Sequence, residues 1–490
     1  APLLLGCGMA VAPLARALRS RGDGCGAAAA REEAGEGEEI LQLDPDDALE
    51  RTMGSGLYQL CVFLFVGLGF YSFAFPFQVM AVFTDVKMAA DPGLPAFTKE
   101  ALSYASSLLF LGWLAGAVLV GPLTDRWGRR PVVFGGMIGL LLCGGIAVVV
   151  PSAAAGSFTA FAIAKFAMGV FIAVGASASV LVQECIPGEL RGRAMAAVNT
   201  AYSLTAAAQA FLSGTATLAM DWRKETLLWY TPALTGVLFG LPLVGESLRW
   251  LVARGRSEAA QSLLARIART NGVPASAQGV TVVAPEALSP AGGASRAGGE
   301  AAEKAEEGGK SLWSPELLPR VSAMAVCWAT CAMTNYGLCY SAGELSPDLY
   351  TNSVLLNLVD IFGYIIVLGV DTFGRRATQS ACFLAAGLCL LLCGVLGAGT
   401  WPVVACALVG RLFVNACFTT VYILVVELFP TDCRSMALGV CTVAARVGGL
   451  FAPLSRNLPA AVSCPVFGAF CLVSALLTLR LPETSGRKLG

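Results

Sequence analysis

Long, continuous runs of apolar residues alternate with short polar segments along most of this chain. Each run reaches about 18 residues or more, the length at which a helix crosses the roughly 30 Å hydrocarbon core of a bilayer. We therefore expect an all-α membrane protein with twelve transmembrane helices. The expected spans are 57–83, 102–123, 132–151, 157–182, 194–218, 227–244, 321–341, 348–370, 378–399, 401–426, 435–454 and 461–480. Because the runs do not alternate between apolar and polar residues, a transmembrane barrel is excluded.

The composition supports this assignment, and the distribution of charge predicts an orientation. Apolar residues make up 56% of the chain and charged residues 13%, about half of the usual share in soluble domains. With both termini in the cytoplasm, 25 of the 33 Lys and Arg residues fall in inner segments and 5 in outer loops. The positive-inside rule favours this arrangement. We expect an integral multi-pass protein of the plasma membrane with cytoplasmic N and C termini.

Two sequence motifs occur twice at nearly the same spacing. A basic loop, DRWGRR, spans 125–130, and its second copy, DTFGRR, spans 371–376, 246 residues later. A second motif has Pro, an acid and Arg at the third, fifth and seventh positions after a Glu, and it begins at Glu184 and again at Glu427. The repeats indicate a duplicated unit of six helices, an arrangement typical of transporters whose halves rock around a central site.

The repeated charges predict a gate at the cytoplasmic face. A carboxylate at the end of an apolar helix is costly unless it is paired, so each Glu is expected to bind an Arg of a basic loop. We expect the network to be complete only when the two halves meet at that side, and to break when it opens. The alternative is that these charges only anchor helix ends. The predicted gate residues are Asp125, Gly128, Arg129, Arg130, Glu184, Arg191, Asp371, Gly374, Arg375, Arg376, Glu427 and Arg434.

The chain divides into two predicted bundles with polar segments around them. The expected units are a disordered cytoplasmic tail (1–50), an N-terminal six-helix bundle (51–244), a cytoplasmic linker (245–320), a C-terminal six-helix bundle (321–481) and a cytoplasmic tail (482–490). Within the linker, 257–269 has the apolar periodicity of a helix, whereas 273–310 is a low-complexity tether.

Several kinds of chemistry are excluded by residues that the chain lacks. Histidine is absent, which excludes histidine metal ligands, a Ser-His-Asp set and a histidine proton relay. No phosphate-binding loop of the form G-x4-G-K-S/T occurs, so an ATP-driven motor in this chain is not expected. We expect no enzyme activity, no cofactor or metal, and no nucleic-acid partner. Most of the 17 cysteines lie in apolar runs, where we interpret them as small packing residues.

A few ionisable side chains lie within the predicted helices, where charge is costly and usually functional. Lys165 and Arg411 lie 246 residues apart at matching positions, and packing or snorkelling toward the outer side is the alternative to a functional assignment. Arg446 lies near the middle of the eleventh predicted helix. It is expected either to line a central cavity and contact a substrate, or to form a buried pair with Asp360 or another acid.

The basic loops resemble the signature of the major facilitator superfamily, and further strings resemble the organic ion transporters among the solute carriers. These strings are DDALE at 46–50, GSGLYQ at 54–59, GESLRWL at 245–251, NYGL at 335–338, the stretch 427–434, RVGG at 446–449 with Pro453, and LPET at 481–484. The resemblance covers about residues 44–490. It implies the twelve-helix facilitator fold and secondary active or facilitative transport of a small organic ion by alternating access, with a coupling ion or counter-substrate as a candidate partner.

The resemblance also implies a substrate class and a set of cavity residues. In this family the position of Arg446 is an acid in cation carriers and an Arg in many anion and zwitterion carriers. It therefore favours an organic anion or a carnitine-like zwitterion, and a buried guanidinium likewise favours a carboxylate. The implied substrate-binding residues are Arg446, Asn199, Tyr202, Trp328, Asn335, Tyr336, Asp360 and Tyr364.

Three departures from the family pattern keep alternatives open. The family usually has a long, cysteine-rich, glycosylated loop after the first helix, whereas only 84–101 is available here. Leu248 replaces a Pro in the string after helix six, and Tyr364 occurs where anion carriers often have Lys. The alternatives are an organic cation transporter, or a non-transporting receptor or scaffold that retains the fold.

Overall fold

The structure of this chain is a computed structural model. The residues that it describes are 41–43, 45–52, 56–75, 82–187, 190–215, 221–273, 280–282, 312–367, 370–396 and 399–484. The predicted tails are therefore described only over 41–43, 45–50 and 482–484. The greater part of the predicted low-complexity tether also lies outside the described residues.

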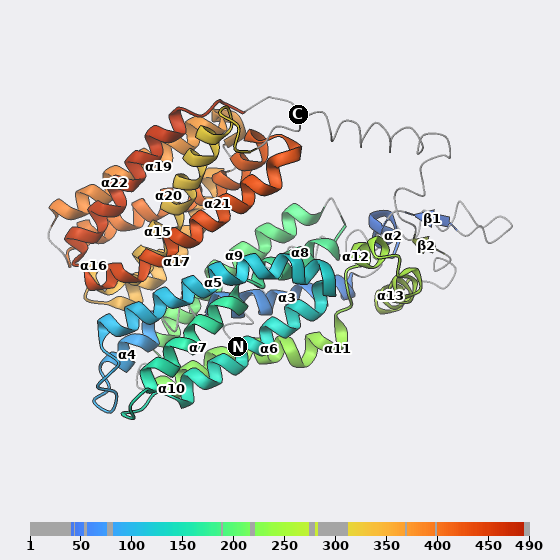
Figure 1. Cartoon of the computed structure of the whole chain (residues 1–490), viewed down its shortest axis with the longest axis horizontal. Helices are drawn as coiled ribbons and strands as arrows, with labels where there is room; N and C mark the ends of the chain where they lie inside the picture. Colours follow the sequence, from blue (N-terminus) through green and yellow to red (C-terminus); the bar gives the residue numbers. More distant parts are fainter. Residues whose placement is uncertain are drawn as a thin grey trace.

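The described residues form two bundles of helices, coloured blue to green and yellow to red in Figure 1. The first contains α3 (Leu57–Phe75), α4 (Asp85–Ala89), α5 (Lys99–Trp127), α6 (Arg129–Val149), α7 (Ser157–Ile172), α8 (Gly175–Glu184), α9 (Arg191–Gly214), α10 (Trp222–Thr235), η3 (Gly236–Gly240) and α11 (Leu241–Leu243). The second contains α15 (Leu318–Tyr340), α16 (Ala342–Leu345), α17 (Leu349–Val367), α18 (Val370–Phe373), α19 (Arg375–Val395), α20 (Trp401–Leu428), α21 (Thr431–Phe451), η6 (Ala452–Asn457) and α22 (Ala460–Leu479).

These helices fall where the apolar runs predict them. Nine spans in the described part of the chain are long and apolar enough to cross a membrane. Helices α3, α9 and α15 occupy the other three predicted spans, although they are not among those nine. The all-helical bundle architecture is confirmed, and the count of twelve membrane crossings stays a prediction.

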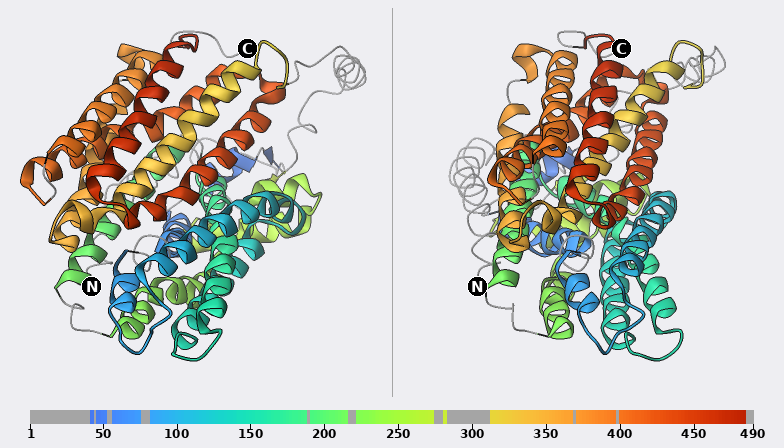
Figure 2. Two further views of the ribbon diagram at one scale, coloured as in Figure 1. Left: turned by 60° about the vertical axis from the view of Figure 1, so that its left-hand side comes forward. Right: turned by 90° about the vertical axis from the view of Figure 1, so that its left-hand side faces the viewer.

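Each bundle has its own apolar core. One core is built from residues of α2 to α13, joined by Tyr340 and Ala452, and the other from residues between Leu312 and Leu481. The bundles lie side by side in both views of Figure 2, and α9 packs against α17 while α5 packs against α21. The small buried side chains in the second core include many cysteines, which agrees with the packing function predicted for them.

A small unit lies at one end of the bundles (Figure 1). It consists of β1 (Leu41–Leu43), α2 (Pro45–Arg51), α12 (Leu248–Ala253), α13 (Ser257–Thr270) and β2 (Val280–Val282), and the two strands pair in parallel. We call this end of the bundles the linker end, and the end that carries α4 and α16 the far end. Helix α13 confirms the predicted helix at 257–269.

The two strands and α2 correct the predicted extent of disorder. Leu41–Leu43 and Pro45–Arg51 lie in the segment predicted to be a disordered tail, and Val280–Val282 lies in the predicted tether. The buried amide of Asn271, at the end of α13, explains how this unit attaches to the first bundle. It accepts a bond from the Tyr58 N–H at 2.8 Å and donates to the Thr52 carbonyl and to Gln59 at 2.9 and 3.0 Å. It thereby caps the start of α3, where helix N–H groups lack partners within the helix.

Candidate functional site

A buried ion pair joins α17 and α20 in the second bundle. The Arg411 guanidinium donates from Nε to Asp360 Oδ1 at 2.8 Å and from Nη2 to Oδ2 at 2.7 Å. It also donates to the Asn335 carbonyl and to Cys339 Sγ. Snorkelling of Arg411 is therefore wrong, because only 3% of this residue is exposed and its charge is paired inside the bundle.

The counterpart of Arg411 in the first bundle, Lys165, is also buried and paired. Its Nζ lies 3.3 Å from both oxygens of Asp85, and neither side chain has exposed surface. Asp85 also accepts from Ser106 at 3.2 Å, and Arg456 of the second bundle approaches it to 3.8 Å. The interpretation of Lys165 as a snorkelling residue is thus wrong. Asp85, Lys165 and Arg456 form a buried charge cluster that joins the bundles at the far end.

Arg446 of α21 has surroundings of a different kind. Its guanidinium carbon lies 3.6 Å from the ring centroid of Trp113, which belongs to α5 in the other bundle. Its Nε is buried without a hydrogen-bond partner. The predicted alternative of a pair between Arg446 and Asp360 is wrong, since Asp360 binds Arg411 with both oxygens.

Aromatic rings of both bundles surround this stack. Tyr336 of α15 lies 5.3 Å from the Phe110 ring and 6.3 Å from the Trp113 ring, centroid to centroid. Of the residues implied as substrate-binding, Arg446 and Tyr336 therefore meet around one ring, Trp113. Neither Trp113 nor Phe110 carries a charge or belongs to a repeated motif, so the sequence offers no signal that singles them out.

The other residues implied as substrate-binding lie on three helices around this region. Trp328 of α15 is only 1% exposed and packs on the Tyr422 ring at 4.3 Å, so it is a core residue in this structure. Asn335, also on α15, offers its carbonyl to Arg411. Asn199 and Tyr202 lie on α9, and Tyr364 lies on α17 one turn beyond Asp360; all three are partly buried.

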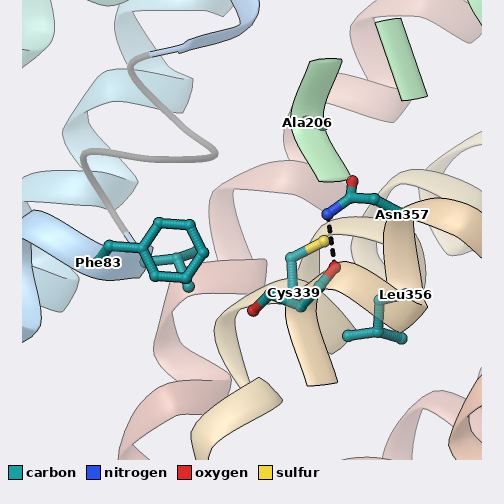
Figure 3. A pocket seen from close by; sticks show the side chains of 7 residues that line it. Phe83, Ala206, Cys339, Leu356 and Asn357 are labelled. Carbon is teal, nitrogen blue, oxygen red and sulfur yellow. Dashed lines mark hydrogen bonds between the residues drawn. The ribbon is translucent and has the colours of Figure 1, made fainter. Parts of the chain in front are cut away.

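A small cavity lies between the bundles (Figure 3). It is lined by Val82, Phe83, Ala206, Cys339, Ser353, Leu356 and Asn357. The Asn357 amide donates to the Ser353 carbonyl at 2.7 Å, and the Cys339 sulfur is the one that Arg411 also contacts. None of the residues implied as substrate-binding lines this cavity.

At the linker end, the first basic loop binds a glutamate of its own bundle, Glu184, and a second one, Glu246, that follows α11. Arg129 donates from Nε to Glu184 at 3.2 Å and from Nη1 to Asp125 at 3.3 Å. The backbone N–H groups of Arg129 and Arg130 donate to Glu246 at 2.9 and 3.0 Å. Glu246 therefore caps the start of α6, where a carboxylate is favoured by the free N–H groups and the helix dipole.

The second basic loop repeats this geometry. Arg375 donates from Nε to Glu427 at 3.2 Å, and its backbone N–H donates to Glu483 at 2.9 Å. The Arg376 N–H donates to Glu483 at 3.3 Å, and the Thr484 hydroxyl donates to Glu427 at 2.5 Å. The predicted pairing of each glutamate with an arginine of its loop is therefore present. The side chain of Asp371 lies outside the described part of the molecule.

Two predicted gate residues, Arg191 and Arg434, donate to backbone carbonyls. Arg191 donates to the Gln183 carbonyl at 2.9 Å, and Arg434 donates to the Phe429 carbonyl at 3.3 Å. Among the described residues, Arg129 binds Glu184 and Arg375 binds Glu427, each inside one bundle. The network shared between the halves stays a prediction for the conformation in which they meet at this end.

The predicted gate does not include the two glutamates that cap α6 and α19, Glu246 and Glu483. Glu246 and Glu483 are each followed by a hydroxyl residue, Ser247 and Thr484, and this repeated pair is a signal that the sequence contains. Burial raises the pKa of the Glu246 carboxyl, and this effect exceeds the opposing effect of the N–H groups of Ser247, Arg130 and Arg129.

Replacing Gly128 with alanine is expected to destabilise the protein by about 1–3 kcal/mol or more. Gly128 has φ +105°, and a Cβ there would collide with the Glu246 carboxylate. Gly135 of α6 is the matched control, because a Cβ there meets open space and alanine favours a helix by about 0.5–1 kcal/mol. Thermal unfolding of the two purified variants in detergent measures the difference. Equal melting temperatures for both variants would contradict this explanation of the glycine.

Comparisons with known proteins agree with this architecture. The family model described as "Sugar (and other) transporter" matches residues 65–490. An organic cation transporter-like protein of Drosophila melanogaster is 30% identical over 407 residues, which cover 78% of this chain and 68% of that protein. Solute carrier family 22 member 7 of Sus scrofa is 31% identical over 399 residues, with coverage of 78% and 68%. The chain belongs to solute carrier family 22.

The fold and the class of protein follow from this membership. The xylose transporter XylE from E. coli, in a partially occluded inward-open conformation, matches with a TM-score of 0.63 and 19% identity over 88% of this chain and all of that one. The fold is that of the major facilitator superfamily, and the protein is a multi-pass membrane transporter of small molecules, not an enzyme.

Proposed function

We propose that this transporter carries small organic anions, or zwitterions that contain a carboxylate, by alternating access. The observation that supports this substrate class is the state of Arg446. In the described part of the chain its guanidinium has an aromatic face as neighbour and no carboxylate, and its buried Nε has no acceptor. A guanidinium that is partly removed from water and lacks a counter-charge favours a carboxylate ligand.

The other buried charges support an anion over a cation. Among the described residues, the buried acids are Asp85, Glu225 and Asp360. Each has a basic partner: Lys165, Lys87 at 2.6 Å, and Arg411, respectively. An organic cation would need a carboxylate without a partner, and these three are already neutralised. Tyr336, which lies beside the Trp113 ring, supplies an aromatic ring and a hydroxyl for the rest of the substrate, and we propose Tyr202 and Asn199 of α9 as further contacts.

The contacts between the bundles support alternating access. They also indicate which end of the molecule is closed in this conformation. The described ion pairs between the two bundles lie at the far end, where Lys99 binds Glu344 at 2.6 Å and Arg456 approaches Asp85. We infer that the far end faces the outside of the cell and is closed, and that the linker end is cytoplasmic in a plasma-membrane protein. The glutamate pairs of the basic loops then stabilise each bundle separately while the inner side is open.

Uptake into proteoliposomes tests the proposal. Three labelled probes of similar size should be compared, a monocarboxylate, a betaine-type zwitterion and a quaternary amine, with and without a pH gradient or an internal counter-substrate. We expect saturable uptake of the anion or the zwitterion at least about tenfold above that of the amine, since one charged hydrogen bond contributes about 1.5–3 kcal/mol. Preferred uptake of the amine would establish the cation alternative, and the absence of uptake for all probes would favour a receptor or scaffold.

A further inference from the structure

Helix α5 presents one face to the second bundle from the far end toward the middle of the molecule. Lys99 binds Glu344, and Ser103 donates to Asn457 at 3.1 Å. Phe110 and then Trp113 follow on the same face, since spacings of three, four and seven residues bring side chains to one side of a helix. Trp113 is the deepest of these four contacts, so it lies where the closed outer contact adjoins the centre.

The register of α5 against α21 explains why Trp113 meets Arg446. Gly449 lets α21 approach so closely that a Cβ there would lie 2.7 Å from the Phe110 ring. One turn further along α5 is Trp113, and one turn back along α21 is Arg446. Because the helices run in opposite directions, these two residues fall opposite each other, and the guanidinium lies at 3.6 Å over the indole ring.

A guanidinium in this position has one face against the indole ring, and its edge carries the N–H groups that can donate hydrogen bonds. Its N–H groups lie in its plane, so contact of the face with an indole leaves them able to bind an oxyanion, and the buried Nε has no acceptor. Trp is the ring that attracts a cation most strongly, and the contact contributes about 2 kcal/mol or more when water is excluded. Without this contact, the arginine side chain would lose its conformational freedom only when the substrate binds. That loss of entropy would lower the affinity for the substrate.

We propose that Trp113 is a positioning residue for substrate, which holds the Arg446 guanidinium across the bundle interface with its edge free for a carboxylate. This inference rests on the proposed function. It adds that the substrate site is shared, since the first bundle orients the charged group that the second bundle supplies. It also adds that affinity for the carboxylate depends on the electron-rich ring at position 113, beyond the apolar volume of the side chain.

The test compares Trp113→Leu, Trp113→Phe and Trp113→Tyr by uptake of the carboxylate probe in proteoliposomes. We expect Trp113→Leu to raise KM about 10- to 30-fold with little change in the maximal rate per folded transporter, and the aromatic variants to recover part of the loss. Trp401→Leu is the matched control, because Trp401 at the start of α20 is 74% exposed and lies outside the basic loops. Its KM should equal that of the unmodified protein.

A second measurement separates positioning from packing. In an Arg446→Lys background, where the planar guanidinium is gone, Trp113→Leu should change KM much less than it does in the unmodified protein. An equal effect in both backgrounds, or a normal KM in Trp113→Leu while Arg446→Ala lacks uptake, would overturn the positioning inference and leave the proposed function intact. The absence of carboxylate uptake by the unmodified protein would overturn both.

Discussion

Arg446→Ala is expected to reduce carboxylate uptake to background while the protein still folds. The change removes a partly buried guanidinium that has no carboxylate partner among the described residues, so the variant keeps the buried ion pairs of Lys165 and Arg411. Loss of a desolvated partner for a substrate charge costs about 2–5 kcal/mol, which corresponds to a fall in affinity of about 30-fold to several thousand-fold. Uptake by purified protein in liposomes, normalised to the folded fraction, measures the effect.

Two further variants sharpen this result. Arg446→Lys keeps the charge but not the planar fork, so we expect weak residual uptake with a raised KM. Arg480→Ala removes an exposed arginine at the end of α22, and its uptake should be unchanged. Carboxylate uptake that survives in Arg446→Ala would contradict the assignment of Arg446 as a substrate ligand, whatever the probe.

Asp85→Asn is expected to destabilise the protein by about 3–5 kcal/mol. The variant is similar in shape, but it leaves Lys165, which has no exposed surface, without its carboxylate and weakens the hold on Arg456. Removal of one partner from a buried pair is costly because the other charge remains in a medium of low dielectric constant. Because Asp85 and Arg456 belong to different bundles, the variant should also weaken closure of the far end. Thermal unfolding in detergent measures the loss of stability.

The exposed ion pair at the same interface is the matched control. Lys99 and Glu344 also join the two bundles, but their side chains are 45% and 36% exposed. Glu344→Gln should therefore change stability by no more than about 1 kcal/mol. Adding Lys165→Met to Asp85→Asn should recover part of the loss, since the unpaired buried charge is then gone. Similar melting temperatures for Asp85→Asn and Glu344→Gln would show that burial of the charge cluster has no special effect.

Much of the architecture could be predicted because it depends on local pattern. Apolar runs of sufficient length must be helical in a bilayer, and each expected span contains a helix in the structure. The repeated loops also predicted their local partners correctly, since Arg129 binds Glu184 and Arg375 binds Glu427. The limits of the disordered tail could not be read from composition, because β1 pairs with β2 across more than 200 residues.

The partners of the buried charges could not be predicted in the same way. Lys165 and Arg411 occupy matching positions in the two halves, yet their carboxylates come from non-matching elements, Asp85 in α4 and Asp360 in α17. The sequence therefore leaves two alternatives for Asp360, contact with the substrate or a pair with Arg446, whereas in the structure it binds Arg411. The sequence pattern indicates which buried charges need a partner. It does not indicate which helices pack against each other, and therefore not which partner is available.

The sequence by itself determined the membrane class, the helices, the duplication and the basic loops with their glutamates. Each of these follows from hydrophobic length, from periodicity or from residues close to helix ends. Only the tertiary structure decided that Arg446 meets Trp113 and that Asp85 holds Lys165 and Arg456. The reason is that packing between helices depends on register and on close approach, as at Gly449 against Phe110. Contacts of this kind bring together residues hundreds of positions apart.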